Sequence, residues 1–161
     1  MMRIFQIGFN KCGTRSLHQH FQKLGLDSVH HDRGRLALRI QQNVASGSDP
    51  LDGYQAFQAF TDMVYISYTV HIEAFKYIDE FLKHYPNAHF ILNTRDKSAW
   101  LQSCRDHPGF VDRMKSVYGY RHESEVLAHW EQDWDLHHQK VRSLVPEDQL
   151  LVFHIDRDDI S

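Results

Sequence analysis

Short apolar runs alternate along the chain with longer stretches in which apolar residues recur every three or four positions. Most of the runs are rich in Ile, Val, Leu and Phe, which is typical of buried strands. The runs cover residues 3–9, 28–30, 59–61, 90–94 and 149–155. The alternation of strands with helices predicts an α/β fold, a three-layer sandwich with a central parallel sheet.

Four stretches between the strands have the periodicity of amphipathic helices. The first carries Leu17, Phe21 and Leu24 on one face. This first stretch ends at Gly25, and the other three cover residues 33–45, 71–85 and 122–144. Residues 46–50 predict a loop, and residues 109–119, which lie between two glycines, predict an irregular or mobile segment.

The first strand leads directly into the sequence Lys11-Cys12-Gly13-Thr14-Arg15-Ser16, after which the first helix continues. Backbone N–H groups at a helix start lack partners and carry the positive end of the helix dipole, so they bind phosphate or sulfate well. Gly13 allows a close backbone approach, and Lys11 adds a positive charge. The alternative is a plain turn in which Thr14 or Ser16 caps the helix. A Walker A loop is disfavoured, because there the lysine follows the glycine.

A second polar cluster follows the strand at residues 90–94. Arg95 and Asp96 stand at the end of that strand, and Ser103 lies eight positions after Arg95, two turns along the next helix. A guanidinium forms paired, charge-assisted hydrogen bonds with phosphate oxygens. Taken singly, Arg95 could form an exposed ion pair and Ser103 could face solvent. Two such clusters, in this order and each at the end of a strand, form a combination that rarely arises by chance.

Together the two motifs resemble those of sulfotransferases, which use 3′-phosphoadenosine 5′-phosphosulfate (PAPS) as the sulfuryl donor. The resemblance covers residues 4–155 and implies the P-loop-NTPase-like sulfotransferase fold. It implies that Arg95 and Ser103 grip the 3′-phosphate and that Lys11 stabilises the leaving oxygen. The acceptor would be a hydroxyl or amine of a small molecule or a carbohydrate. The residues that would bind PAPS are Lys11, Cys12, Gly13, Thr14, Arg15, Ser16, Arg95 and Ser103.

The resemblance also points to a proton acceptor at the end of the third strand. Branches of the family use a histidine or a glutamate, and this chain has Asp62 after Thr61. A free aspartate has a pKa of about 3.9, so this catalytic role requires burial or a neighbouring carboxylate that raises the pKa. An equal alternative is that Asp62 caps the following segment through a backbone hydrogen bond. His31 and His71 are further candidates that no motif supports.

Composition narrows the choice of partners and compartment. The length of 161 residues predicts a single domain, 1–161. The formal net charge of −3, from 18 basic and 21 acidic residues, argues against nucleic acid or an acidic membrane as a partner. Two cysteines, no amino-terminal signal and no long apolar run predict a cytoplasmic protein. The 13 histidines follow no strong zinc pattern, so we expect that the protein binds no metal. We also expect that the histidine pairs at 30–31 and 137–138 lie at the surface.

Two functions of different class fit these motifs. The first is a PAPS-dependent sulfotransferase, and the second is a non-catalytic nucleotide- or anion-binding module of the same fold. The second is motivated by two departures from the family. The candidate base is unusual, and the Arg-Lys-Gly segment that forms a lid over the 3′-phosphate in sulfotransferases has no counterpart up to Ser161. Either the chain is truncated or this branch of the family is minimal. The acceptor itself stays open, since acceptor pockets are built from variable loops.

Overall fold

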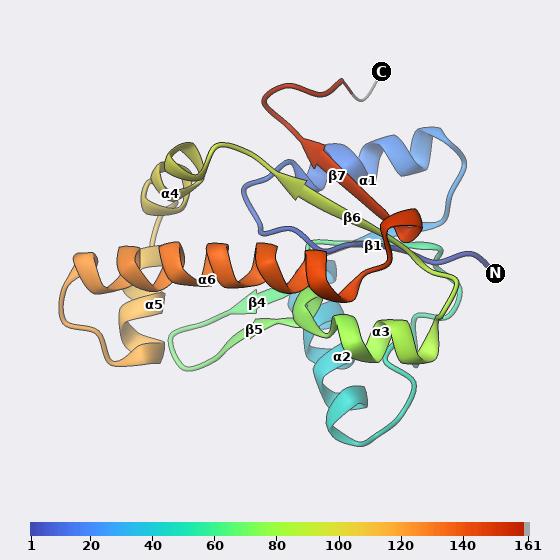
Figure 1. The fold of residues 1–161 in the computed structure, drawn as a ribbon. Coiled ribbons are helices and arrows are strands. Elements are labelled where there is room, and N and C mark those ends of the chain that lie inside the picture. Colours follow the sequence, from blue (N-terminus) through green and yellow to red (C-terminus); the bar gives the residue numbers. More distant parts are fainter. Residues whose placement is uncertain (160–161) are drawn as a thin grey trace.

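The computed structural model describes residues 1–159 and has a five-stranded parallel sheet at its centre (Figure 1). The strands, in their spatial order, are β2 (Ser28–His30), β3 (Ala59–Thr61), β1 (Ile4–Gln6), β6 (His89–Thr94) and β7 (Leu150–His154). The helices are α1 (Thr14–Lys23), α2 (Arg35–Ala45), α3 (Ile78–His84), α4 (Lys97–Arg105), α5 (Phe110–Tyr118) and α6 (Glu123–Leu144). The expected α/β fold with a central parallel sheet is confirmed.

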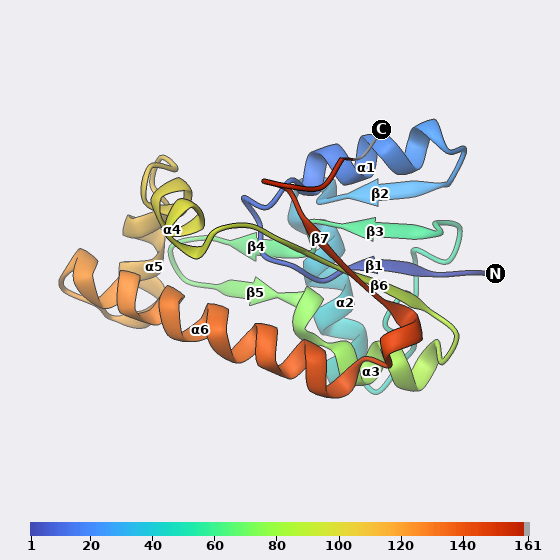
Figure 2. The ribbon, with the colours of Figure 1, turned by 45° about the horizontal axis from the view of Figure 1, so that its top comes forward.

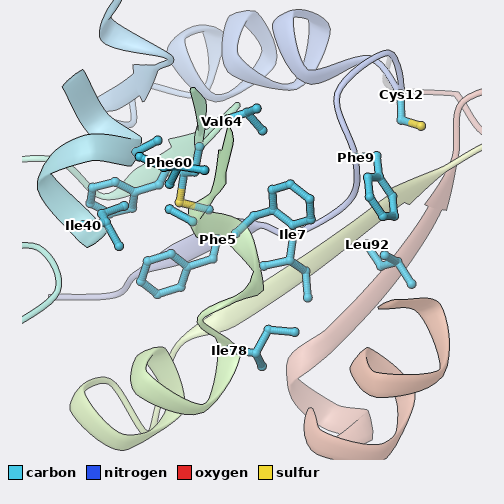
Figure 3. Packing of buried hydrophobic residues seen from close by; sticks show 14 of the residues in the cluster. Phe5, Ile7, Phe9, Cys12, Ile40, Phe60, Val64, Ile78 and Leu92 are labelled. Atoms are coloured by element: carbon cyan, nitrogen blue, oxygen red, sulfur yellow. The ribbon is translucent and has the colours of Figure 1, made fainter. Parts of the chain in front are cut away.

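Helices cover both faces of the sheet (Figure 2). Side chains of a strand alternate between the two faces, so neighbours such as Phe90 and Ile91 enter different apolar clusters. Ile91 packs with Leu17 and Phe21 of α1 on one face. Phe90 belongs to the larger cluster beneath α2, α3 and α6, part of which is seen in Figure 3. The sheet is thus buried on both sides, as its apolar strands predict.

Residues 71–85 are not one helix, as their periodicity predicts. His71–Glu73 form strand β5, which pairs antiparallel with β4 (Val64–Ile66), and α3 begins only at Ile78. A turn at residues 67–70, closed by a backbone hydrogen bond of 2.8 Å, joins the two strands. β-Branched residues favour the extended backbone of this hairpin. The periodic pattern therefore correctly predicted a helix in this stretch but placed its first residue too early.

Residues 109–119 form helix α5 instead of an irregular segment. Gly109 and Gly119 have φ angles of 69° and 71° and stand just outside the helix, so they delimit it and do not interrupt it. Phe110 and Met114 bury one face of α5. A smaller difference concerns Leu24, which follows the last residue of α1 and is exposed although it was expected on the apolar face.

The histidine pair on α6 is buried, contrary to the expectation of surface histidines. His137 is 3% exposed, and its Nε2 donates to the carbonyl of Ile7 at 2.6 Å. His138 donates through Nδ1 to the Trp134 carbonyl and accepts at Nε2 from the Thr94 hydroxyl, at 2.9 Å. Burial lowers the pKa of both rings, that of His137 to about 4, so both are neutral at pH 7. These bonds fasten α6 to β1 and β6.

Two buried amide side chains hold the carboxyl end of β1. Oδ1 of Asn93 accepts hydrogen bonds from Gly8 N at 2.9 Å and Gln6 Nε2 at 2.6 Å, and its Nδ2 donates to the Cys12 carbonyl at 2.7 Å. Gln6 Oε1 accepts from the backbone N–H of Asp62 at 2.8 Å. A Cβ at Gly8 would lie 2.0 Å from the Asn93 carbonyl oxygen, so only glycine fits there. The ends of β1, β3 and β6 are therefore joined by one hydrogen-bonded network.

Replacing Asn93 by alanine should lower the free energy of unfolding by about 2 to 4 kcal/mol, because buried groups of Gly8 and Cys12 lose their partners. Urea unfolding followed by circular dichroism measures this change. Asn87→Ala, at an exposed position before β6, is the control and should change the free energy by less than about 0.5 kcal/mol. A loss below about 1 kcal/mol for Asn93→Ala would contradict the importance of the network.

Candidate functional site

The loop between β1 and α1 presents free backbone donors at the carboxyl edge of the sheet. Gly13, with a φ of 77°, occupies the N-cap position, and α1 has no side-chain cap there. Within residues 1–159, no hydrogen bond is found from the N–H groups of Thr14, Arg15 and Ser16. Unpaired donors at the positive end of a helix fit an anionic sulfate or phosphate group.

Lys11 lies where two hollows meet. We call the first the Arg95 hollow; it has a volume of about 580 Å³ and is lined by Lys11, Arg95, Ser103 and His107, among others. We call the second the Asp62 hollow; it has a volume of about 590 Å³ and lies between the start of α1, strand β4 and the residue Asp62. Both Lys11 and His107 line both hollows. The lysine that the loop motif singled out thus faces two adjoining sites.

His107 fixes the position of the Lys11 side chain. The Lys11 Nζ atom lies 2.9 Å from Nδ1 of His107. Burial, together with the positive charges of Lys11 and Arg113, lowers the pKa of His107, so the ring is neutral at pH 7. A neutral ring accepts a hydrogen bond from the ammonium through Nδ1. Lys11 is therefore held in place between the two hollows.

The Arg95 hollow brings together the two motifs. The Nη1 atom of Arg95 donates to the Lys11 carbonyl at 3.2 Å, which links β6 to the loop, and Ser103 of α4 borders the same space. The Arg95 Nε atom is buried and has no hydrogen-bond partner within residues 1–159, while Asp156 Oδ1 lies 3.8 Å away. Arg95 also borders a larger hollow of about 950 Å³ beside α6. The guanidinium therefore keeps donor capacity for a further anionic group.

Asp62 stands at the end of β3 with its carboxylate in the Asp62 hollow. His30 lies beside it, with Nε2 3.7 Å from Oδ2. Within residues 1–159, no backbone N–H is found to donate to this carboxylate, so the capping alternative has no hydrogen bond behind it. Burial raises the pKa of Asp62, and nearby positive groups, above all His31, oppose that rise. A half-buried carboxylate whose pKa is raised is suited to take up a proton.

The histidines near the strand ends differ in their relation to this hollow. His31 lines the Asp62 hollow, as does His30, whose pKa burial lowers to about 4. His71 does not: its side chain is 3% exposed, with Nδ1 3.0 Å from the Tyr118 hydroxyl and Nε2 3.7 Å from a carboxylate oxygen of Glu73. Of the two alternatives to Asp62, the structure thus brings only His31 to the site.

Two residues of the loop motif have side chains that point away from both hollows. Cys12 is fully buried beside Phe9 (Figure 3), and burial, with a smaller effect of Cys104, raises the pKa of its thiol. Only the backbone of Cys12 is available to a ligand. Ser16 lines a separate groove of about 640 Å³ along α1, with Gly13 and Ile155. This groove leaves room next to the loop for a further part of a ligand.

Unusual backbone conformations gather at the Asp62 hollow. Five non-glycine residues of the described chain have positive φ angles: Lys11, His31, Asp32, Arg33 and Asp62. Four of them line this hollow, and Asp32 stands between two of them in the chain. Such conformations are disfavoured for L-residues and cluster at functional sites, where the surrounding structure holds them.

Sequence reasoning missed four side chains of the site. His30 pairs with Thr61 in the sheet register, so its position at the end of β2 could have placed it at this edge. Arg33 lies in a turn of unusual backbone conformation, which no local pattern announced. His107 and Arg113 lie before and within α5, whose position depends on its packing against α4 and α6. Their sequence neighbourhood therefore carries no signal of a site.

Metal ligands and membrane-spanning helices are two further features that would bear on the class of site. No cluster of three or more His, Cys, Asp or Glu side chains within residues 1–159 has an arrangement that could hold a metal ion. In the same range, no helix has the length and apolar character needed to cross a lipid bilayer.

Comparison with known proteins agrees with the geometry of the loop and of β6. Residues 3–116 match the profile of the sulfotransferase domain family, and this range includes both motifs. The chain is also similar to Ava biosynthesis cluster protein M of Aspergillus versicolor, with 25% identity over 188 aligned residues that cover 95% of this chain and 71% of that protein. Because the family profile matches well over half of its residues, the chain belongs to the sulfotransferase domain family.

Proposed function

We propose that the protein transfers a sulfuryl group from PAPS to a hydroxyl or amine of a small-molecule or sugar acceptor. The observation that carries this proposal is the position of Lys11, which lines both the Arg95 hollow and the Asp62 hollow. The 3′-phosphate of the donor would occupy the Arg95 hollow and the acceptor the Asp62 hollow. The sulfuryl group would then lie between them, at the start of α1.

The residues present fit the charge of such a donor. PAPS supplies the activated sulfuryl group, and the unpaired N–H groups of Thr14 and Arg15 provide preorganised donors for its sulfate and 5′-phosphate oxygens. Arg95 and Ser103 face the space next to Lys11 where a second phosphate would bind. The groove beside Ser16 and Ile155 offers a place for the adenosine.

Lys11 and Asp62 would have complementary roles in the transfer. As the bond from sulfur to the acceptor oxygen forms, the bond from sulfur to the bridging phosphate oxygen breaks, and the Lys11 ammonium stabilises the charge on that leaving oxygen. The acceptor proton passes to the Asp62 carboxylate. The products are the sulfated acceptor and adenosine 3′,5′-bisphosphate.

Donor binding tests the first part of the proposal. Calorimetry should detect binding of adenosine 3′,5′-bisphosphate, and Arg95→Ala should weaken it by about 10- to 100-fold, because a charge-assisted contact to the 3′-phosphate is lost. Affinity for adenosine 5′-monophosphate should stay nearly unchanged. Arg105→Ala, on the exposed side of α4, is the control. Equal weakening of both nucleotides by Arg95→Ala would make Arg95 a structural residue, and no binding to the wild type would overturn PAPS as the donor.

Lys11→Met should lower kcat by about 100- to 1,000-fold and change the affinity for adenosine 3′,5′-bisphosphate much less, because its charge is needed most in the transition state. Assays with PAPS and a panel of alcohols, phenols, amines and sugars measure the rate. Lys83→Met, at an exposed ion pair with Glu80, removes the same charge elsewhere and should leave the rate unchanged. Nucleotide binding by the wild type without turnover of any acceptor would favour the non-catalytic module.

Asp62→Asn should keep donor affinity and lose most of the transfer rate, because an amide does not take up the acceptor proton. In the wild type, kcat/KM should fall as the pH drops through the pKa of Asp62. Because burial raises this pKa, the decline should begin at a higher pH than for an exposed aspartate. The residual rate of Asp62→Asn should lack this acidic limb, whereas Asp148→Asn, at an exposed position, should retain it. Near-normal activity of Asp62→Asn together with an inactive His31→Ala would assign the base to His31.

A further inference from the structure

The Asp62 hollow carries more positive charge than the proposed donor requires. Its lining includes four cationic side chains, Lys11, Arg15, Arg33 and Arg113, but only one carboxylate, that of Asp62. Within residues 1–159, no carboxylate is found within 4.0 Å of any of these four, whereas Lys97, Arg105 and Lys140 of the neighbouring helices α4 and α6 form ion pairs. In a chain with a net charge of −3, this is a local excess of positive charge.

The proposed donor accounts for only part of this excess. Lys11 and Arg15 belong to the loop that would hold the sulfate and the 5′-phosphate. The 3′-phosphate would lie in the Arg95 hollow, which Arg33 and Arg113 do not line. These two arginines therefore face only the space assigned to the acceptor.

Arg113 is placed on a rigid element with donor capacity to spare. It lies in the middle of α5, which packs against α4 and α6. Its Nε atom is buried, and within residues 1–159 no hydrogen-bond partner for it is found. Buried donors in native proteins are nearly always satisfied, so this guanidinium, whose residue lines the hollow, has donor capacity left for an acceptor group of a ligand.

Arg33 lines the same hollow from a constrained turn. Its φ of 55° and ψ of 32° follow the positive φ angles of His31 and Asp32. The Asp32 carboxylate accepts hydrogen bonds of 2.6 Å from both the Tyr54 hydroxyl and Arg35 Nη2, and these bonds fix the turn. A strained turn that is fixed in this way presents Arg33 in a defined place.

Strand β4 gives the hollow an apolar wall. Tyr65 and Ile66 line it, and the Tyr65 ring lies so close to Gly34 that a Cβ there would be 2.4 Å from a ring carbon. The ring is therefore seated against the backbone of the turn that carries Arg33. An aromatic or aliphatic group of a ligand would pack on this wall, between the two arginines and Asp62.

We propose that the acceptor is an amphipathic hydroxylated acid: an oxyanion group, such as a carboxylate, sulfonate or phosphate, binds Arg33 and Arg113, and an apolar body packs on Tyr65 and Ile66. Arginine suits this role because its planar fork forms paired hydrogen bonds with oxyanions. The inference rests on the proposed function and narrows its acceptor from any small alcohol, phenol, amine or sugar to an acid.

The test compares acids with neutral molecules of the same shape on the enzyme saturated with adenosine 3′,5′-bisphosphate. The probes are 4-hydroxyphenylacetate with 4-hydroxyphenylacetamide, and 4-hydroxybenzenesulfonate with 4-hydroxybenzenesulfonamide. Calorimetry at low ionic strength should show each acid binding at least about tenfold more tightly than its amide, and added salt should reduce that ratio. The two pairs distinguish a carboxylate from a sulfonate as the preferred oxyanion.

Variants assign the preference to the two arginines. Arg113→Gln and Arg33→Asn should each bring the ratio of acid to amide affinity close to one and leave the affinity for adenosine 3′,5′-bisphosphate within about twofold. Asparagine is chosen at position 33 because it tolerates the left-handed backbone. Arg113→Lys, which keeps the charge but not the fork, should retain part of the preference. Arg121→Gln, at an exposed position before α6, removes the same charge and should leave the ratio unchanged.

The outcomes separate this inference from the function on which it rests. If the nucleotide binds but no acid binds more tightly than its amide, the acid acceptor is overturned and the sulfotransferase proposal stands. If Arg113→Gln and Arg33→Asn weaken the nucleotide as much as the acids, both arginines belong to the donor site, and the inference is likewise overturned. If the nucleotide itself does not bind the wild type, the proposed function fails first.

Discussion

One buried side-chain amide, that of Asn93, connects the loop after β1 with the end of β3. It bonds to Gly8 and Cys12 on either side of the loop, and through Gln6 it reaches the backbone of Asp62. Because these bonds lie in a fully buried place, water cannot replace them when they break. The distance between the anion-binding loop and the candidate base therefore depends on the core of the sheet and not on the surface loops.

The site accumulates features that oppose folding. Uncompensated cations repel one another around Lys11, and the same region contains every non-glycine residue of the described chain that has a positive φ angle. Each such feature lowers stability by an amount that the surrounding structure must offset. The large apolar cluster beneath the loop, with Phe9 and Trp100 fully buried, supplies that compensation. An anionic ligand would relieve the repulsion, so binding and stability should rise together in this protein.

Local signals in the sequence predicted the parallel sheet, the loop after β1 and the pairing of Arg95 with Ser103 in one hollow. These features are encoded by short patterns: apolar runs, a glycine next to hydroxyl residues, and an arginine at a strand end. The hairpin β4–β5 was missed because the helical periodicity of residues 71–85 concealed strand β5, and α5 was missed because its two flanking glycines predicted an irregular segment. The buried His137 was missed because its burial depends on a partner distant in the sequence. His137 is buried because the carbonyl of Ile7, 130 positions away, accepts its hydrogen bond. Asn93 and Gln6 gave no signal for the same reason.

The hairpin and α5 lie outside the five-stranded sheet, yet they supply Tyr65, Ile66 and Arg113 to the wall of the Asp62 hollow. The loop that would hold the donor, by contrast, directly follows strand β1 of the sheet. In the proposed function, the residues that would contact the acceptor and the residues that would hold the donor are thus carried by separate pieces of the chain. A substitution in the hairpin or in α5 would therefore alter the wall of the Asp62 hollow and leave the backbone donors of the loop in place.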